Sequence, residues 1–378
     1  MREIRDIRAA VVGTGFIGVV HVEALRRLGV EVVGVVGSSP ERAAAKEGLP
    51  APYPSFEAML ADASVEVVHL TTPNHLHFEQ ARAALAAGKH VVCEKPLAMT
   101  SAETAELVRL AEESGLVHAV NFNVRFYPQC QEARARMQAG ELGAVRLVSG
   151  GYLQDWLLHD TDWNWRLDPA LGGSLRAVGD IGSHWLDLIT FVTGRHIEAV
   201  MADLATFIPV RRKPVGPVET FAVGAAAGDT VEAPMETEDA AGILLRFAGG
   251  ARGVLTVSQV SAGRKNLLSF QIDGAERSLA WASERPEELW TGHRDRPNEL
   301  MLRERGDYPP GHAQGFADTF KALYRAVYAA VAAGGPPPEP DYPTFADGHE
   351  EALIGEAIAR SHAEQRWVTV DPVPQEVR

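Results

Sequence analysis

The chain has 378 residues, a formal net charge of -14 at neutral pH, and 46% hydrophobic residues. A chain of this length usually folds as two domains, each long enough to bury its own core. The acidic balance and the lack of a basic block argue against nucleic acid or an anionic membrane as a partner, because such surfaces select clustered lysine and arginine. No apolar run approaches the roughly 20 residues that a membrane-spanning helix needs.

Cysteine usage and the N-terminal residues bear on the compartment. The sequence contains only Cys93 and Cys130, which excludes a disulfide framework and fits a reducing environment. The first predicted strand begins near Arg8, which leaves no room for the apolar core of a signal peptide. We therefore expect a cytoplasmic protein.

The first 124 residues alternate short β-rich runs with helical stretches, a pattern typical of a parallel sheet wound with helices. The helical patterns include 75–87 and 101–114, and the second of these opens with the capping residue Thr100. Strands are predicted at 8–12, 30–36, 65–70, 90–93 and 117–121. The sequence thus predicts an α/β domain over residues 1–124.

Past Tyr127 and Pro128 the pattern changes to long alternating runs joined by glycine turns. Such runs predict an antiparallel meander, and hence an α+β domain over residues 125–378. The stretch 208–238, rich in Pro, Gly and Glu, predicts a loop. Because helices usually cover only one face of such a sheet, the other face is free to associate, and we expect a homo-oligomer. The predicted strands of this domain are 243–247, 253–260, 267–272 and 278–281.

A glycine-rich hexapeptide follows the first predicted strand and precedes a helical run. In such a motif the first glycine permits a tight turn, the second lets a pyrophosphate approach the backbone, and the third lets helix pack on strand. In this strand-to-helix context the motif favours dinucleotide binding over a merely structural turn. The residues are Gly13, Thr14, Gly15, Phe16, Ile17 and Gly18.

The end of the second predicted strand bears on the choice between NAD and NADP. An Asp or Glu normally stands there and holds the adenine ribose hydroxyls. Here Ser38 and Ser39 occupy that place, followed by Arg42, so no carboxylate repels a 2'-phosphate. This favours NADP over NAD. The alternative is that the serines simply cap a helix beginning at Pro40, and both interpretations are compatible.

Two further segments follow predicted strands at the same edge of the sheet. Thr72, Pro73, Asn74 and His77 follow the third strand, where they would lie under the cofactor. The histidines there favour a helix-start cluster over a metal site, because neither cysteine nor carboxylate completes a ligand set, and we expect no metal. The second of these segments is Glu94, Lys95 and Pro96, at the end of the fourth strand. Lys95 is either a ligand-facing cation or a member of an ordinary surface ion pair.

Beyond the boundary, Asp180 and His184 are spaced to share one face of a helix. A carboxylate so placed can orient an imidazole and stabilise its protonated form, which makes a general acid or base. By spacing alone, however, a structural Asp-His pair is the more common arrangement. Aromatic and polar residues around Tyr152 and Trp163, together with His312, are typical of carbohydrate recognition, or else belong to the core or an interface.

Taken together, these motifs resemble the Gfo/Idh/MocA oxidoreductases, the relatives of glucose-fructose oxidoreductase and inositol dehydrogenase. The resemblance rests on the glycine hexapeptide, the Thr72 and Glu94 segments, Trp165-Arg166, and the Asp180/His184 spacing, which occur in the family's order. It implies an α/β Rossmann domain followed by an α+β domain with a large, mostly antiparallel open sheet. That sheet often mediates homodimers or homotetramers.

The resemblance also implies roles for individual residues. Lys95 would hydrogen-bond the reacting oxygen, His184 would exchange its proton, and Asp180 would orient His184. The proton acceptor varies among relatives between lysine and histidine, and we favour His184. Glu94 and Pro96 would line the nicotinamide and its ribose. Arg166 would lie near the carboxamide and Arg125 near the substrate.

The leading hypothesis is an NAD(P)-dependent dehydrogenase or reductase that acts on a secondary alcohol or carbonyl of a sugar, polyol or related compound. One alternative is a glycosidase-type enzyme that retains NAD and breaks a glycosidic bond through transient oxidation, as some relatives do. The other is a sensor that binds nucleotide without turnover. Retention of Lys95, Asp180 and His184 argues against the sensor.

Overall fold

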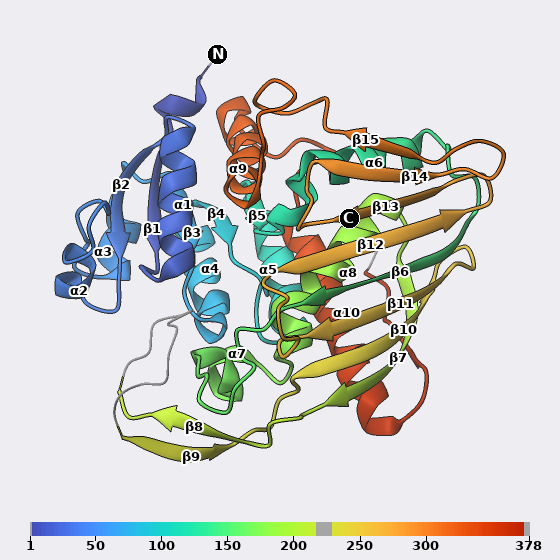
Figure 1. The fold of residues 1–378 in the computed structure, drawn as a ribbon. Coiled ribbons are helices and arrows are strands. Elements are labelled where there is room, and N and C mark those ends of the chain that lie inside the picture. The colour runs from blue at the N-terminus through green and yellow to red at the C-terminus, as the bar shows by residue number, and fades with distance from the viewer. Residues whose placement is uncertain (1, 217–228, 374–378) are drawn as a thin grey trace. The chain divides into compact units, whose positions relative to one another are not determined.

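The computed structural model describes residues 2–216 and 229–373. The chain divides into two compact units, drawn in Figure 1. Unit 1 comprises residues 1–123, 316–352 and 373–378, and unit 2 comprises 124–315 and 353–372. The first boundary between the units, after residue 123, lies one residue from the predicted one. The prediction of two continuous domains, 1–124 and 125–378, differs from the structure because residues 316–352 belong to unit 1.

Unit 1 is built on a five-stranded parallel sheet in the order β2-β1-β3-β4-β5. On the outer side of β2, Pro52 forms an isolated parallel β-bridge with Val35. Most strand residues are buried, because helices cover both faces of a parallel sheet. The strands are β1 (Arg8–Val12), β2 (Glu31–Val36), β3 (Val67–Leu70), β4 (His90–Cys93) and β5 (His118–Val120).

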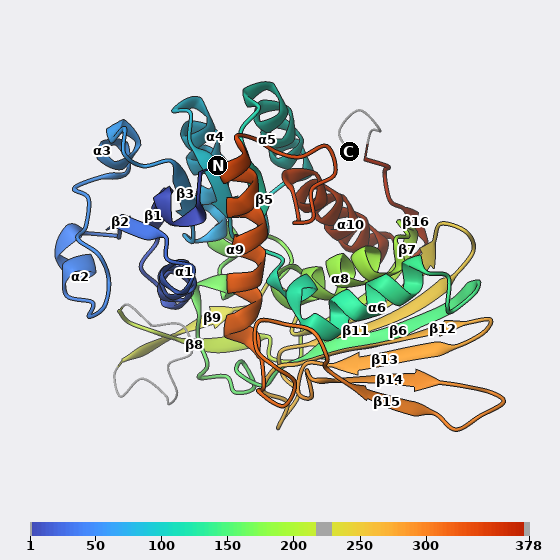
Figure 2. The same cartoon turned by 90° about the horizontal axis from the view of Figure 1, so that it is seen from above.

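Helices lie on both sides of this sheet, with α1 and α9 on one side and α4 and α5 on the other (Figure 2). The α5 helix begins after Thr100, whose side chain accepts from the Glu103 backbone N–H in a capping box, as predicted. The α-helices of unit 1 are α1 (Phe16–Arg27), α2 (Pro40–Ala44), α3 (Phe56–Ala61), α4 (His77–Ala86), α5 (Ser101–Ser114), α9 (Phe316–Ala333) and the first part of α10 (Phe345–Glu364). The short 3-10 turns are η1 (Ile4–Asp6) and η2 (Asn74–Leu76), and η3 (Asn123–Phe126) begins at the last residue of the first segment.

Helix α9 explains why residues far along the chain belong to unit 1. It buries one apolar stripe at helical spacing, including Phe320, Leu323, Tyr324, Val327 and Tyr328, and it packs against α1. A sequence pattern that shows an amphipathic helix does not show which sheet the helix covers. The sequence pattern therefore did not indicate that residues 316–352 belong to unit 1, and the predicted linear division left them in the second domain.

Unit 2 contains a nine-stranded sheet in the order β15-β14-β13-β12-β6-β11-β10-β7-β16. The sheet is mixed, because β6 lies between β11 and β12 and runs parallel to β11. The prediction of one continuous meander was wrong at this point, although β12 to β15 do form one. The strands are β6 (Val145–Leu153), β7 (Ile197–Ala205), β10 (Ala240–Phe247), β11 (Arg252–Ser258), β12 (Leu267–Gly274), β13 (Ser278–Ala282), β14 (Glu288–Gly292), β15 (Glu299–Leu302) and β16 (Val368–Thr369).

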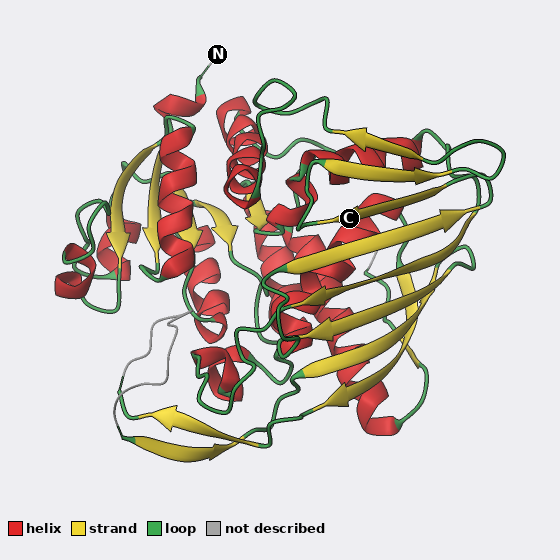
Figure 3. Ribbon diagram, viewed as in Figure 1, coloured by secondary structure: helices red, strands yellow, loops and turns green. Residues whose placement is uncertain are grey.

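One face of this sheet is covered by helices, which Figure 2 shows from the sheet's edge. These are α6 (Pro128–Gln138), α8 (Ser183–Thr193) and the second part of α10 (Phe345–Glu364), with Trp185 among the fully buried side chains. The strands, yellow in Figure 3, alternate buried and exposed residues, as a sheet with one solvated face requires. The remaining helical turns are η4 (Trp165–Leu167), α7 (Pro169–Gly172) and the π-helical η5 (Val178–Gly182).

The predicted loop at 208–238 was wrong on both flanks. Strands β8 (Val210–Pro214) and β9 (Thr230–Pro234) pair in an antiparallel two-stranded sheet, while residues 217–228 lie outside the described residues. Each strand includes a proline only at its end, where a two-stranded ladder tolerates it. Within the described part of the chain, no helix is long and apolar enough to cross a membrane.

Candidate functional site

The glycine motif forms a tight connection between β1 and α1. Gly13 has φ +107°, and a Cβ there would lie 2.5 Å from the Thr71 carbonyl oxygen. A Cβ at Gly18 would lie 2.1 Å from the Gly13 carbonyl oxygen, whereas one at Gly15 would meet no heavy atom within 4 Å. Gly15 is also the N-cap residue of α1, where backbone N–H groups attract anions. The three glycines thus have the three predicted geometries, and the open position suits a pyrophosphate.

The end of β2 lies beside this motif. A Cβ at Gly37 would come within 3.0 Å of the Thr14 hydroxyl oxygen, so the two segments are in close contact. Ser39 caps α2 by accepting the Arg42 backbone N–H at 3.2 Å, as the capping alternative predicted, while Ser38 and the Arg42 side chain are exposed. A second cation lies here: Lys46 Nζ donates to the Thr14 carbonyl oxygen at 2.5 Å. Sequence reasoning missed Lys46, because it follows α2 in an irregular segment where no local pattern marks it as facing the glycine motif.

The segment after β3 is tied to the glycine motif and to the segment after β4. The Thr71 hydroxyl donates to the carbonyls of Val12 and Gly13, at 2.9 and 3.0 Å. His77 is fully buried, with Nδ1 2.8 Å from the Pro96 carbonyl oxygen and Nε2 2.9 Å from that of Thr72. Burial lowers the pKa of His77, against the effect of these two carbonyls. Because its two ring nitrogens lie beside these two carbonyls, His77 connects the two segments.

Glu94 and Lys95 follow β4 directly. The Glu94 carboxylate is buried and accepts hydrogen bonds from His21 Nε2 at 3.0 Å, Asn121 Nδ2 at 2.5 Å and the Lys95 backbone N–H at 3.2 Å. Burial alone would raise the pKa of Glu94, but the bonds from His21 and Asn121 and the charge of Lys95 hold it below its ordinary value. Lys95 itself is half-buried.

These segments share one edge of the sheet. Strands β1, β3 and β4 are consecutive neighbours and run parallel, so the glycine motif, the Thr72 segment and the Glu94 turn all leave the sheet at its carboxyl end. Ligands of doubly wound sheets bind at that end. Unit 1 therefore brings together the predicted cofactor residues that lie in it.

Unit 2 positions Asp180 and His184 at the junction of η5 and α8. The Ser183 backbone N–H bonds to the Val178 carbonyl, which gives a π turn in place of the predicted continuous α-helix. Such π segments often occur at functional sites. Asp180 accepts from Arg166 Nε at 3.0 Å and from Gln259 Nε2 at 2.9 Å. Asp180 thus connects Arg166, another predicted site residue, to Gln259, which sequence reasoning missed.

Tyr152 lies beside His184, with ring centroids 6.2 Å apart. Its hydroxyl donates to Asn266 Oδ1 at 2.7 Å, which also accepts from Gln154 Nε2 at 2.7 Å, and Gln154 in turn accepts from Trp156 Nε1. Burial first, and then nearby Tyr127 and Asp180, raise the pKa of Tyr152. This row of amides and aromatics next to His184 is suited to sugar hydroxyls. Asn266 gave no sequence signal, because it stands alone before β12.

Three other predicted substrate residues have different surroundings. Arg125 is buried and forms a bidentate ion pair with Asp187, an arrangement that favours a structural role for both residues. Trp163 packs under Lys213, whose Nζ lies 5.2 Å from the ring centroid. His312 is exposed in a loop whose backbone carbonyls are held by Arg303.

A buried charged cluster supports the region of Asp180. Asp239 accepts from both Arg176 and Arg211, and all three side chains are fully buried. The neighbouring Glu238 accepts the backbone N–H groups of Arg176 and Val178, at the start of η5, while burial raises its pKa. Among the described residues, no group of three or more His, Cys, Asp or Glu is placed to hold a metal ion.

Comparison with known proteins places this architecture in a family. Residues 7–122 match a family model described as an oxidoreductase family with an NAD-binding Rossmann fold, and residues 130–280 match one described as the GFO/IDH/MocA C-terminal domain. Levoglucosan dehydrogenase of Pseudarthrobacter phenanthrenivorans is 31% identical, over 98% of this chain and 100% of that protein.

Two solved structures are similar over almost the whole chain. Levoglucosan dehydrogenase in complex with NADH and L-sorbose has a TM-score of 0.88 at 30% identity, covering 97% of this chain and 99% of the other. An inositol dehydrogenase homologue from Azotobacter vinelandii, complexed with NAD+, has a TM-score of 0.81 at 26% identity, covering 96% and 97%. The chain therefore belongs to the GFO/IDH/MocA family of NAD-binding oxidoreductases.

Proposed function

We propose that the protein is an NAD(P)-dependent dehydrogenase or reductase that interconverts a secondary alcohol and a carbonyl of a sugar, polyol or related compound. The observation that carries the proposal is the arrangement at the carboxyl edge of the unit 1 sheet. There the open position at Gly15, after β1, suits a pyrophosphate. Lys95 follows β4, which is separated from β1 only by β3. The named sugar dehydrogenase among the relatives supports the substrate class.

The chemistry assigns a role to each polar group. When bound, the nicotinamide exchanges a hydride with the carbinol carbon. Removal of that hydride leaves a carbonyl only if the hydroxyl proton also departs, so a base is required, and we assign this role to His184. The Lys95 cation stabilises negative charge on the reacting oxygen. Asp180, held by Arg166 and Gln259, orients His184.

Lys95→Met and His184→Ala test these assignments. Each should lower turnover by about 10²- to 10⁴-fold, because each removes a group that acts on the reacting oxygen or its proton. Binding of NADH, followed by fluorescence, should be retained in both. The matched controls are Lys265→Met, which removes an exposed lysine, and His293→Ala, which alters the β14–β15 turn. Wild-type turnover in Lys95→Met or His184→Ala would remove that residue's role.

For the cofactor, we propose that the chain prefers NADP. Residues 37–39 offer no carboxylate to the ribose. Lys46 adds a cation at the glycine motif, and Arg42 adds another in the short helix α2 that follows these residues. The two solved relatives are complexed with NADH and NAD+. A preference for NADP would therefore arise from the residues that follow β2 in this chain.

Arg42→Ala tests this cofactor preference. It should raise the dissociation constant for NADP at least about fivefold more than that for NAD, since it removes a charged partner of the phosphate alone. Arg82→Ala, on the surface of α4, is the control. Equal effects of Arg42→Ala on the two cofactors would contradict the preference.

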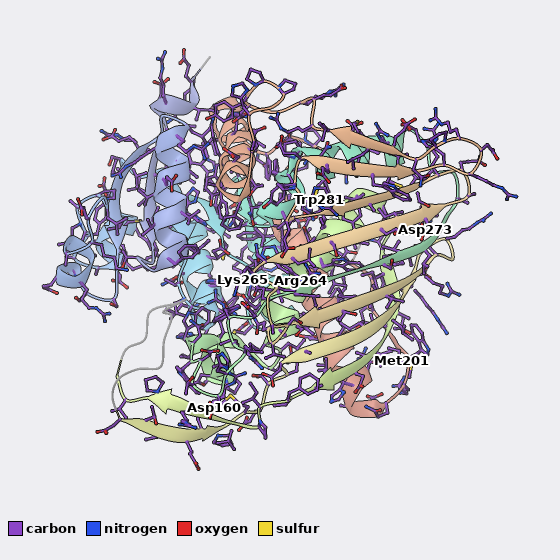
Figure 4. All side chains as sticks on the ribbon, viewed as in Figure 1. Asp160, Met201, Arg264, Lys265, Asp273 and Trp281 are labelled. Atoms are coloured by element: carbon purple, nitrogen blue, oxygen red, sulfur yellow. The ribbon has the colours of Figure 1, made fainter. Side chains whose placement is uncertain are left out.

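We also propose that a second copy of the chain covers the exposed face of the unit 2 sheet, giving a homodimer or homotetramer. Met201, Leu244 and Val254 pair across three adjacent strands, and they are 37%, 44% and 42% exposed. Leu147, 40% exposed, and Asp273 lie on the same face, and Figure 4 labels Met201 and Asp273. An apolar stripe of this kind marks an association surface.

Light scattering after gel filtration tests the association. Leu244→Arg should shift the protein toward monomer, because it places a charge in the middle of the stripe. Val231→Arg, at an exposed valine on β9, should leave the mass unchanged. A monomeric wild-type protein would contradict the proposal.

A further inference from the structure

A buried row of polar side chains runs through unit 1 behind the Glu94 turn. Glu94 Oε1 lies 3.0 Å from His21 Nε2, His21 Nδ1 lies 3.0 Å from His69 Nδ1, and His69 Nε2 lies 3.0 Å from the Tyr328 hydroxyl. His21, His69 and Tyr328 are fully buried. They come from α1, β3 and α9, so the row connects three distant segments of the chain in series to one carboxylate.

The carboxylate fixes the direction of every hydrogen bond in the row. Glu94 accepts three donors, and an ionised carboxylate donates none, so the proton of this contact lies on His21 Nε2. A neutral His21 then accepts at Nδ1, which places the next proton on His69 Nδ1. His69 in turn accepts at Nε2 from the Tyr328 hydroxyl. Each buried atom in the row thus has one partner of the complementary kind.

The alternative is one added proton, on His21, and it satisfies the row less well. A doubly protonated His21 would donate from Nδ1, so His69 would have to donate from Nε2 to the Tyr328 oxygen. The Tyr328 proton would then need a different acceptor, inside a site without solvent access. Burial lowers the pKa of His69 well below its ordinary value, which agrees with a neutral His69 ring.

We propose that Tyr328, His69 and His21 form a one-way chain of donated hydrogen bonds that holds Glu94 ionised and, through it, positions the Lys95 turn. The link to Lys95 is direct, because the second Glu94 oxygen accepts the Lys95 backbone N–H. The three residues are positioning residues and make no contact with the reaction themselves. Their effect on turnover rests on the function proposed for Lys95, whereas the proton positions in the row do not.

Tyr324 offers a matched comparison on the same helix, one turn before Tyr328. Its ring packs against His21 and His69, with centroids 5.2 and 4.8 Å away. Its hydroxyl, however, has no hydrogen-bond partner among the described residues. Removal of the two hydroxyl groups therefore separates participation in the row from simple packing.

The proton positions can be read from two-bond ¹⁵N–¹H correlation spectra of the protein without cofactor. Wild type should show His69 protonated at Nδ1 and His21 at Nε2. Tyr328→Phe should change the ring-nitrogen resonances of both histidines, because His69 Nε2 loses its donor. Tyr324→Phe should leave the proton positions as they are. Protonation of His69 at Nε2 in wild type, or unchanged spectra in Tyr328→Phe, would overturn the chain.

A second pair of variants, His69→Gln and His69→Leu, separates the loss of the hydrogen bonds from a general effect of replacing the ring. In His69→Gln the amide oxygen can accept from Tyr328 and the amide nitrogen can donate to His21, so the direction of the row is kept. His69→Leu removes both groups. His69→Leu and Tyr328→Phe should lower kcat about fivefold or more, the effect of one net hydrogen bond, while His69→Gln should recover most of it. Equal losses in His69→Gln and His69→Leu would overturn the positioning role.

The outcomes separate the two proposals. If the spectra show the predicted protons and kcat is unchanged in Tyr328→Phe while Lys95→Met abolishes turnover, the positioning role is wrong and the proposed function stands. If Lys95→Met turns over like wild type, the proposed function fails, and the spectra still decide whether the chain of hydrogen bonds exists.

Discussion

The two regions that carry the predicted site residues are held in place by different forces. In unit 1 the glycine motif and the turns after β3 and β4 are fixed by backbone geometry and by hydrogen bonds of buried side chains such as His77. In unit 2 the start of η5, which carries Asp180, is fixed by buried charges, with Asp239 between Arg176 and Arg211. The difference indicates that unit 1 should tolerate changes facing the ligand, while unit 2 should lose stability when one charge is removed.

The largest expected effect is in unit 2. Asp239→Asn should lower the free energy of unfolding by about 3–5 kcal/mol, because it leaves two buried guanidinium groups without their carboxylate. Glu113→Gln, which breaks an exposed ion pair with Arg109, should change it by less than about 1 kcal/mol. Urea unfolding followed by tryptophan fluorescence measures both. Similar small effects in the two variants would end the contrast between the units.

Two glycines in unit 1 should separate ligand binding from folding. Gly15→Ala should leave the unfolding midpoint unchanged, because a Cβ there meets nothing, and should raise the NADH dissociation constant at least about tenfold by blocking the pyrophosphate. Gly18→Ala should cost about 1–3 kcal/mol of stability, since its Cβ would press on the Gly13 carbonyl. Calorimetry with and without NADH measures both quantities. Loss of stability in Gly15→Ala would contradict the conclusion that the space beside Gly15 is open.

A smaller effect concerns a carboxylate near the edge of unit 1. The hydrogen bond from the Tyr53 hydroxyl, aided by Ser64, lowers the pKa of Asp62 to about 2. Since the unfolded value is about 3.9, this stabilisation is present above about pH 4 and is lost as the pH falls through 2. The stability difference between wild type and Tyr53→Phe should therefore shrink between pH 5 and pH 2. A difference that does not vary with pH would show that Asp62 does not sense Tyr53.

Local patterns predicted much of unit 1. The first and fourth strands, the capped α5 and the three glycine geometries follow from contiguous residues, where propensity, capping and backbone freedom act over a few positions. The covering helix α9 was not assigned to this unit, because an amphipathic stripe does not name its partner.

Unit 2 was less accessible from the sequence. The insertion of β6 between β11 and β12 joins segments separated by about a hundred residues, and strand pairing at that distance leaves no local signal. For the same reason the sequence paired Asp180 with its helix neighbour His184 and missed Gln259 on a distant strand end. Isolated polar residues such as Asn266 and Lys46 gained meaning only from the fold.

The most direct test of the central claim is a spectrophotometric assay with a panel of sugars and polyols, measuring the reduced-nicotinamide band with NAD and NADP. Wild-type protein should reduce the cofactor with at least one member that carries a secondary alcohol, and Lys95→Met should lose most of that rate while still binding NADH. Reduction at equal rates by wild type and Lys95→Met, or no reduction with any member of the panel, would contradict the account.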